Sequence, residues 1–187
     1  MTEAQRRFLK TVRVSCEASA MQNSILAAFQ HGGIYKESTG TAYREDFRCA
    51  LRLEIRKIAT GYSGKVGEET HCDNIGKLAD SITRQFSKIL KGDRFRIGTA
   101  QKALNLYLKF LWCLGIHPVP PPHCPLDRTI LEKAGVRGAW TKLDCMKTYQ
   151  EWIGRVKVKA NGKSIGEWEL ESWQAAKPSA TRKARKP

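Results

Sequence analysis

The chain has 187 residues, of which 41% are hydrophobic, so it can bury the core of one domain and is not largely disordered. Lys and Arg number 33 against 18 Asp and Glu, a formal net charge of +15, which favours a polyanionic partner such as nucleic acid. The sequence contains no apolar run of 18 residues and no apolar N-terminal segment. We therefore expect no membrane span and no secretory signal, and predict a cytoplasmic protein.

Apolar residues recur at helical spacing over most of the chain and predict an all-α fold. The predicted helices span 3–30, 40–61, 73–90, a segment from a cap at Thr99 to 115, a segment after the N-cap Asp127, 142–157 and 165–175. Two capping-box spacings, Thr141 with Asp144 and Ser164 with Glu167, mark the starts of the last two helices. The one strand-like stretch, RVKVKA at 155–160, is explained equally well by a helix end.

Two segments are predicted to be non-helical. Five prolines lie between His117 and Pro125, and because proline lacks an amide donor we expect a stiff extended loop over 116–125. The last eleven residues, 177–187, hold five positive charges and no negative ones, which predicts a disordered basic tail. Such a tail contacts phosphate or improves solubility, and the sequence favours neither. The folded domain is then 1–176.

The six cysteines are spread along the chain without a C-x-x-C pair, and in a cytosolic protein we expect free thiols. Four zinc-ligand types, Cys113, His117, His123 and Cys124, fall within twelve residues. Their spacing fits no common structural zinc site, because two of them are adjacent and prolines separate the rest. We therefore predict no metal and no cofactor, and interpret the cluster as a buried thiol with surface loop histidines.

Positive charge is concentrated between Arg84 and Lys109, where seven basic residues face the single acid Asp93. This segment covers the end of one predicted helix, the turn KGDRFRIG and the next helix. A turn of this kind presents backbone amides and a helix N-terminus to a DNA phosphate, and flanking cations strengthen the contact. The alternative is a solvated basic face. Candidate DNA-binding residues are Lys91, Arg94, Arg96, Gly98, Thr99, Gln101 and Arg128.

Two stretches, IGTAQKALNLYLKFLW at 97–112 and PPPHCPLDRTIL at 120–131, together resemble the helix-hairpin-helix superfamily of DNA glycosylases. The resemblance places the hairpin at about 86–112 and a catalytic loop at about 116–127. The stretch RFRIGTAQ at 94–101 contains one glycine, Gly98, where the family hairpin has two glycines separated by one residue. The Gln101–Lys102 pair and the acidic-aromatic stretch EWELESW at 167–173 are similar to the archaeal 8-oxoguanine glycosylases.

The resemblance implies a role for two residues. Asp127 stands where the family has its catalytic aspartate, and Lys102 where lyase-active members have a Schiff-base lysine. A carboxylate near the sugar stabilises the positive charge that develops as an N-glycosidic bond breaks, and a lysine amine can replace water as the nucleophile. The family flips its base into a pocket, for which Trp112, His123 and Trp168 are the candidates.

The predicted function is therefore excision of a modified base from DNA by a monomeric enzyme, with oxidised guanine in repair or glucosylated hydroxymethylcytosine in anti-phage defence as the substrate. Each residue also has a simpler interpretation, since an aspartate at a helix start is commonly an N-cap. The alternative functions are a non-catalytic DNA-binding module that grips the duplex backbone and a basic RNA-directed toxin or nuclease. The second is disfavoured because the sequence has no paired carboxylates or His motif of suitable spacing.

Overall fold

The computed structural model describes residues 1–30 and 33–176. Within them the chain forms eight α-helices and four short 3₁₀ turns, so the predicted all-α class is confirmed. The helices are α1 (Glu3–Val12), α2 (Glu17–Phe29), α3 (Thr41–Ala59), α4 (Glu68–Phe86), α5 (Ile97–Cys113), α6 (Arg128–Lys133), α7 (Met146–Ala160) and α8 (Ile165–Ala176). None of these helices is long and apolar enough to cross a lipid bilayer. The predicted tail at 177–187 lies outside the described residues.

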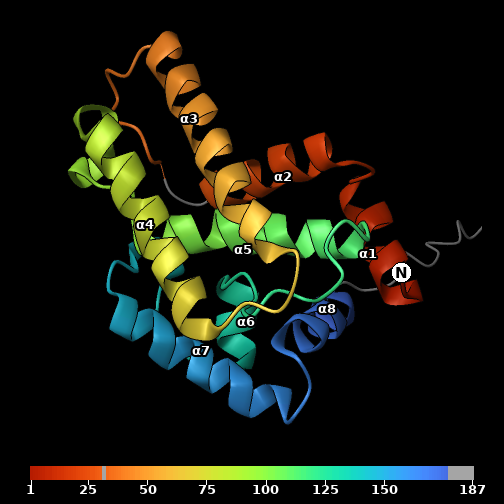
Figure 1. Cartoon of the computed structure of the whole chain (residues 1–187). Helices are drawn as coiled ribbons and strands as arrows, with labels where there is room; N and C mark the ends of the chain where they lie inside the picture. The colour runs from red at the N-terminus through yellow and green to blue at the C-terminus, as the bar shows by residue number, and fades with distance from the viewer. Residues whose placement is uncertain (31–32, 177–187) are drawn as a thin grey trace, which may run out of the picture.

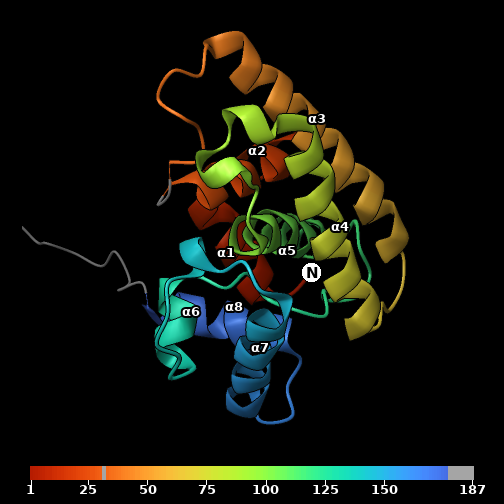
Figure 2. The ribbon, with the colours of Figure 1, turned by 90° about the vertical axis from the view of Figure 1, so that its left-hand side faces the viewer.

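The α5 helix is the centre of the fold. In Figure 2 it is seen nearly end on with the other helices around it, and in Figure 1 it separates α2 and α3 from α6, α7 and α8. Nearly all of its residues are buried, including the polar side chains Gln101, Lys102, Asn105 and Lys109. A helix surrounded on every face must pair each such group inside the protein. The partners of these four residues define the candidate site.

Two predicted helix ranges are corrected. The range 3–30 is divided, because Arg13 adopts a left-handed conformation (φ 56°) and ends α1 before α2 begins at Glu17. The third helix, α4, begins at Glu68 rather than 73 and ends at Phe86, and the 3₁₀ turn Ser87–Ile89 follows it. The stretch 155–160 is helical throughout, within α7.

The cap of α5 differs from the prediction. Its N-cap is Arg96, so Thr99 lies inside the first turn. Asp144 does not start a helix with Thr141, because its Oδ1 atom accepts the Ile97 amide at 3.2 Å and thereby caps α5 from a distant segment. The predicted cap of α8 is confirmed, since Ser164 Oγ accepts the Glu167 amide at 3.3 Å.

Candidate active site

The two catalytic candidates lie side by side. Lys102, on α5, donates from Nζ to Asp127 Oδ2 at 3.0 Å, and the two side chains are 9% and 28% exposed. The other carboxylate oxygen of Asp127 accepts the Ile130 amide at 3.0 Å, so Asp127 is also the N-cap of α6. The ammonium group of Lys102 lies 5.1 Å from the centroid of the Trp140 ring. Asp127 is therefore held at two atoms, and its simple capping role and its contact with Lys102 coexist.

Gln101 fixes the proline-rich loop that carries Asp127. Its Nε2 donates to the Leu126 carbonyl and its Oε1 accepts the Leu126 amide, both at 3.0 Å. Gln101 is fully buried, so its predicted contact with DNA is wrong. Because these two bonds are made to the residue directly before Asp127, Gln101 positions the carboxylate beside Lys102.

A cavity of about 390 Å³ opens beside this pair, within the size range of small-ligand sites. Helices α1, α2, α5 and α8 and the end of the proline-rich loop form its walls. The lining residues are Phe8, Thr11, Val12, Asn23, Leu26, Ala27, Gln30, Lys102, Leu106, Lys109, Phe110, Pro125, Asp127, Glu169 and Trp173. The cavity thus combines aromatic faces, two side-chain amides and two lysine–carboxylate pairs.

The second of these pairs is fully buried. Lys109 Nζ lies 2.5 Å from Glu169 Oε2, and each side chain is 2% exposed. The same ammonium group lies 3.9 Å from the centroid of the Phe8 ring and 5.8 Å from that of Trp173. Sequence reasoning missed these four residues as site residues. A signal was present in the EWELESW stretch, which contains both Glu169 and Trp173, and in the two-turn spacing of Lys102 and Lys109 on α5.

The predicted base-pocket residues Trp112, His123 and Trp168 do not line this cavity. Trp112 and Trp168 are partly buried against the hydrophobic core. His123 is 1% exposed, so its predicted surface position is wrong. It lies 2.9 Å from the hydroxyl of Tyr149, through Nδ1, and its Nε2 has no hydrogen-bond partner in the described part of the chain.

His123 belongs to a buried polar network next to the site. Asn105 on α5 donates to Tyr149 Oη at 3.1 Å, and its Oδ1 lies 2.8 Å from His71 Nε2. His71 Nδ1 in turn lies 2.7 Å from the hydroxyl of Tyr62. Burial lowers the pKa of His71 to about 4 and that of His123 to about 2, and the charges of His71 and Lys157 also oppose protonation of His123. Both imidazoles are therefore neutral near pH 7.

The N-terminus of α5 is not free to bind a phosphate. The Ile97 amide donates to Asp144, and the Gly98 amide donates to the Leu143 carbonyl at 2.8 Å. Trp140 also covers this end, because a Cβ atom on Gly98 would lie 1.7 Å from the Trp140 carbonyl oxygen. The amides of Ile97 and Gly98 are therefore not available to a phosphate, and Gly98 serves close packing.

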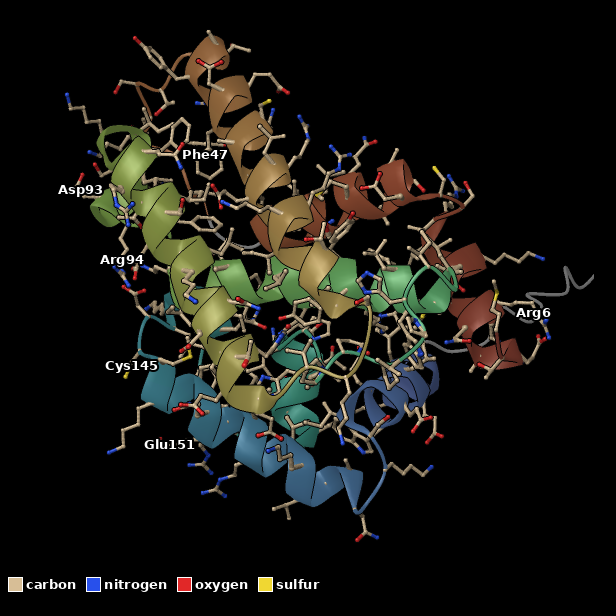
Figure 3. The ribbon with its side chains drawn as sticks, in the orientation of Figure 1. Arg6, Phe47, Asp93, Arg94, Cys145 and Glu151 are labelled. Carbon is tan, nitrogen blue, oxygen red and sulfur yellow. The ribbon has the colours of Figure 1, made fainter. Side chains whose placement is uncertain are left out.

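The basic side chains predicted to contact DNA are divided between two places. Arg94, which projects from the α4–α5 connection (Figure 3), forms ion pairs with Asp144 at 2.8 Å and Asp80 at 3.4 Å. Arg128, on α6, is largely exposed and pairs with Glu132 at 2.8 Å. The remaining predicted residues Lys91, Arg96 and Thr99 line a small cavity together with Arg94.

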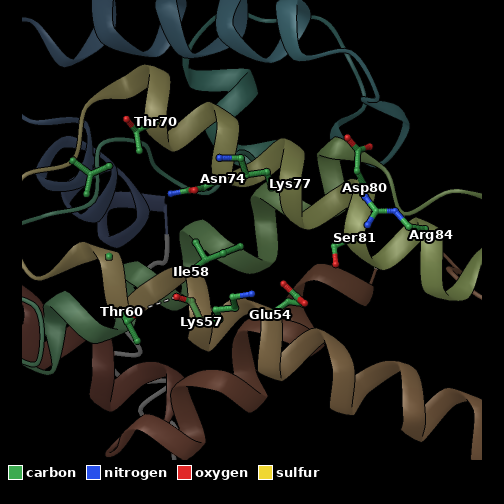
Figure 4. A pocket seen from close by; sticks show the side chains of 12 residues that line it. Glu54, Lys57, Ile58, Thr60, Thr70, Asn74, Lys77, Asp80, Ser81 and Arg84 are labelled. Atoms are coloured by element: carbon green, nitrogen blue, oxygen red, sulfur yellow. Dashed lines mark hydrogen bonds between the residues drawn. The ribbon is translucent and has the colours of Figure 1, made fainter.

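A further cavity, of about 640 Å³, lies between α3 and α4 (Figure 4). Its lining mixes cations and anions, and the figure shows them spread along the groove: Lys57, Lys77 and Arg84 with Glu54 and Asp80. It contains no lysine–carboxylate contact within ion-pair distance and none of the predicted catalytic residues. Within residues 1–30 and 33–176, no group of three or more His, Cys, Asp or Glu could hold a metal ion. The Lys102–Asp127 cavity is therefore the better candidate site.

Cys113 and Cys124, the thiols of the considered zinc cluster, are buried free cysteines. Burial raises the pKa of Cys113 to about 12 and that of Cys124 well above its ordinary value. Both therefore stay protonated at neutral pH and are poor metal ligands in this form.

No family model, curated protein or solved structure matches this chain. The functional argument therefore depends on the geometry of the site.

Proposed function

We propose that the protein is a DNA glycosylase, which excises a modified base that has been flipped out of the duplex. The observation that carries the proposal is the contact between Lys102 and Asp127 at the wall of a cavity of about 390 Å³. These residues are 25 positions apart in the chain, and a separate buried residue, Gln101, holds them together. A net charge of +15 supports a nucleic-acid partner.

The pair has the chemistry that the reaction needs. When the N-glycosidic bond breaks, its electron pair leaves with the base and positive charge develops on the deoxyribose, which the carboxylate of Asp127 stabilises. The amine of Lys102, once it has lost a proton, bonds to C1′ as the base leaves. A further amine proton then passes to O4′ as the C1′–O4′ bond opens, which yields the protonated Schiff base. An ammonium group is not a nucleophile, so deprotonation of Lys102 precedes attack. Without that step, water is the nucleophile and the enzyme is monofunctional.

The cavity offers contacts for a base. Phe8 and Trp173 provide aromatic surfaces, with ring centroids 4.9 Å apart and planes at 86°. Asn23 and Gln30 provide amide donors and acceptors for the hydrogen-bonding edges of a flipped base. Oxidised guanine and hypermodified cytosine are the two substrate classes that we propose to test.

The alternative is a non-catalytic DNA-binding module. It is favoured by the fact that both oxygens of Asp127 already have partners, the Lys102 ammonium and the Ile130 amide. In that case the pair only fastens the proline-rich loop to α5.

Formation of abasic sites tests the proposal. Wild-type protein is incubated with DNA that carries oxidised guanine, with glucosylated phage DNA and with unmodified DNA. Asp127→Asn keeps a side chain that caps helices well and should lower the rate by about 10²- to 10³-fold. Asp73→Asn, at an exposed position on α4, is the matched control and should retain full activity. DNA binding without abasic sites on any substrate would leave the binding module as the function.

Borohydride trapping tests the lysine separately. If Lys102 forms a Schiff base, reduction links wild-type protein covalently to DNA, and Lys102→Ala abolishes this adduct. The control variant Lys10→Ala, at an exposed position on α1, retains the adduct. Excision by wild-type protein without an adduct would assign the nucleophile to water.

A further inference from the structure

A second, smaller cavity of about 220 Å³ lies at the N-terminal end of α5. It is built from Ala28 of α2 and from three segments that are far apart in the chain: residues 33–34, residues 91–99 and residues 141–142. Four cationic side chains and two hydroxyls line it, namely Lys91, Arg94, Arg96, Lys142, Thr99 and Thr141. None of its described lining residues is acidic.

Hydrogen bonds fix the three segments relative to one another. The Lys91 amide donates to the Ile34 carbonyl, and the Lys36 amide to the Ile89 carbonyl, each at 2.8 Å. Arg96 donates from Nη1 to the Thr141 carbonyl at 3.3 Å. The cationic side chains therefore converge on the cavity from anchored backbone rather than from a single helix face.

Much of this charge has no internal counterion. Arg94 is compensated by Asp144 and Asp80. Lys91 and Lys142 form no ion pair with any residue in 1–30 or 33–176, and the bond of Arg96 is to an uncharged carbonyl. Like charges that converge on one concavity repel one another, and a bound anion relieves that repulsion.

The cavity adjoins the candidate active site. Thr99 and Lys102 are three residues apart on α5, so they lie on one face of the helix about 4.5 Å apart along its axis. Ala28 of α2 lines the small cavity, and its neighbour Ala27 lines the larger one. The two cavities therefore lie on neighbouring parts of the α2–α5 contact.

We infer that the small cavity binds a backbone phosphate of the DNA strand whose base enters the active site. Lys91, Arg96 and Lys142 supply charge, and the hydroxyls of Thr99 and Thr141 donate to phosphate oxygens. The contact positions the strand without reading its sequence. Side chains thus take the place of the α5 amides, which are engaged by Asp144 and Leu143. The inference rests on the proposed function, because DNA is the source of the phosphate.

Binding of an unmodified duplex, followed by fluorescence anisotropy between 50 and 200 mM salt, tests the inference without any excision. Lys91→Ala/Lys142→Ala should weaken binding about tenfold and flatten the dependence of log K on log salt by about one. The control, Lys10→Ala/Lys159→Ala, removes the same charge from exposed positions that line no cavity described above. It should weaken binding less than twofold. Equal losses in the two double variants would overturn the inference.

Inorganic phosphate distinguishes the source of the anion. The melting temperatures of wild-type protein and of Lys91→Ala/Lys142→Ala are compared with and without phosphate. If phosphate raises only the wild-type value while both proteins bind DNA equally, the cavity binds free phosphate and the assignment to DNA is wrong. Circular dichroism melting of the variants checks folding, which should persist because both lysines are exposed. If the wild-type protein excises no base but Lys91→Ala/Lys142→Ala still loses DNA affinity tenfold, the proposed function is refuted and the assignment of this cavity to a DNA phosphate is retained.

Discussion

Gly98 is the position at which a single methyl group should disturb both the fold and the candidate site. A Cβ atom there would lie 1.7 Å from the Trp140 carbonyl oxygen and 3.2 Å from Leu143 Cβ, whereas non-bonded atoms in contact are about 3.5 Å apart or more. In Gly98→Ala the segment at 140–143 must therefore move away from α5. The movement breaks the bond from the Gly98 amide to the Leu143 carbonyl, which measures 2.8 Å.

Overpacking costs about 1–3 kcal/mol, and an unsatisfied buried amide costs about 1–3 kcal/mol more. We expect Gly98→Ala to lower the free energy of unfolding by about 2–6 kcal/mol, measured by urea denaturation. Because the Lys102 ammonium lies 5.1 Å from the centroid of the Trp140 ring, the proposed excision of a base should be slowed as well.

Gly154 provides the matched control, since it lies within α7 and a Cβ atom there would have no neighbour within 4 Å. Gly154→Ala should stabilise the protein by about 1 kcal/mol, the difference in helix propensity. A Gly98→Ala protein within 1 kcal/mol of wild type would refute the reasoning, because it would mean that the two segments are not in contact.

Three further predictions concern stability. The pKa of His71 is lowered to about 4 and that of His123 to about 2. Below pH 6.5, roughly the pKa of a histidine in an unfolded chain, these two residues take up protons when the protein is unfolded but not when it is folded. The free energy of unfolding should therefore fall by about 2 kcal/mol per histidine between pH 7 and 5. Lys109→Met should cost about 3–5 kcal/mol by leaving Glu169 buried and unpaired, and Lys109→Met/Glu169→Leu should recover most of it. Gln101→Leu should cost about 2–4 kcal/mol, because two buried backbone groups lose their partners.

Each of these predictions has an outcome that contradicts it. A stability that stays level from pH 7 to 5 would show that the histidines take up protons in the folded state. A double variant as unstable as Lys109→Met would mean that shape, not charge, dominates at that position. For Gln101, the control is Gln85→Leu on the exposed surface of α4, and equal effects would exclude the role of Gln101 in holding the loop.

The helical class and the order of the helices follow from the sequence, because apolar spacing depends on the local chain and recurs in nearly every segment. The cap of α8 at Ser164 and the N-cap at Asp127 were predictable for the same reason, since a cap bonds within three residues. Local patterns failed where a distant segment decided the outcome. Thr99 has a side chain that can cap a helix, yet α5 is capped by Asp144, which accepts the Ile97 amide from 47 positions further along the chain.

In the candidate site, too, some features follow from the local sequence and others depend on contacts between distant segments. The sequence alone determined an excess of positive charge and, through Gln101–Lys102 and the proline-rich loop, two candidate catalytic residues. Only the tertiary structure decided that Lys102 and Asp127 form an ion pair at 3.0 Å. It also decided that the buried Gln101 side chain hydrogen-bonds the Leu126 backbone instead of contacting DNA, and that Lys109 and Glu169 form a second ion pair. The physical reason is that α5 is enclosed on every side. Its polar residues must find partners on other helices, and helical periodicity does not specify which helices these are.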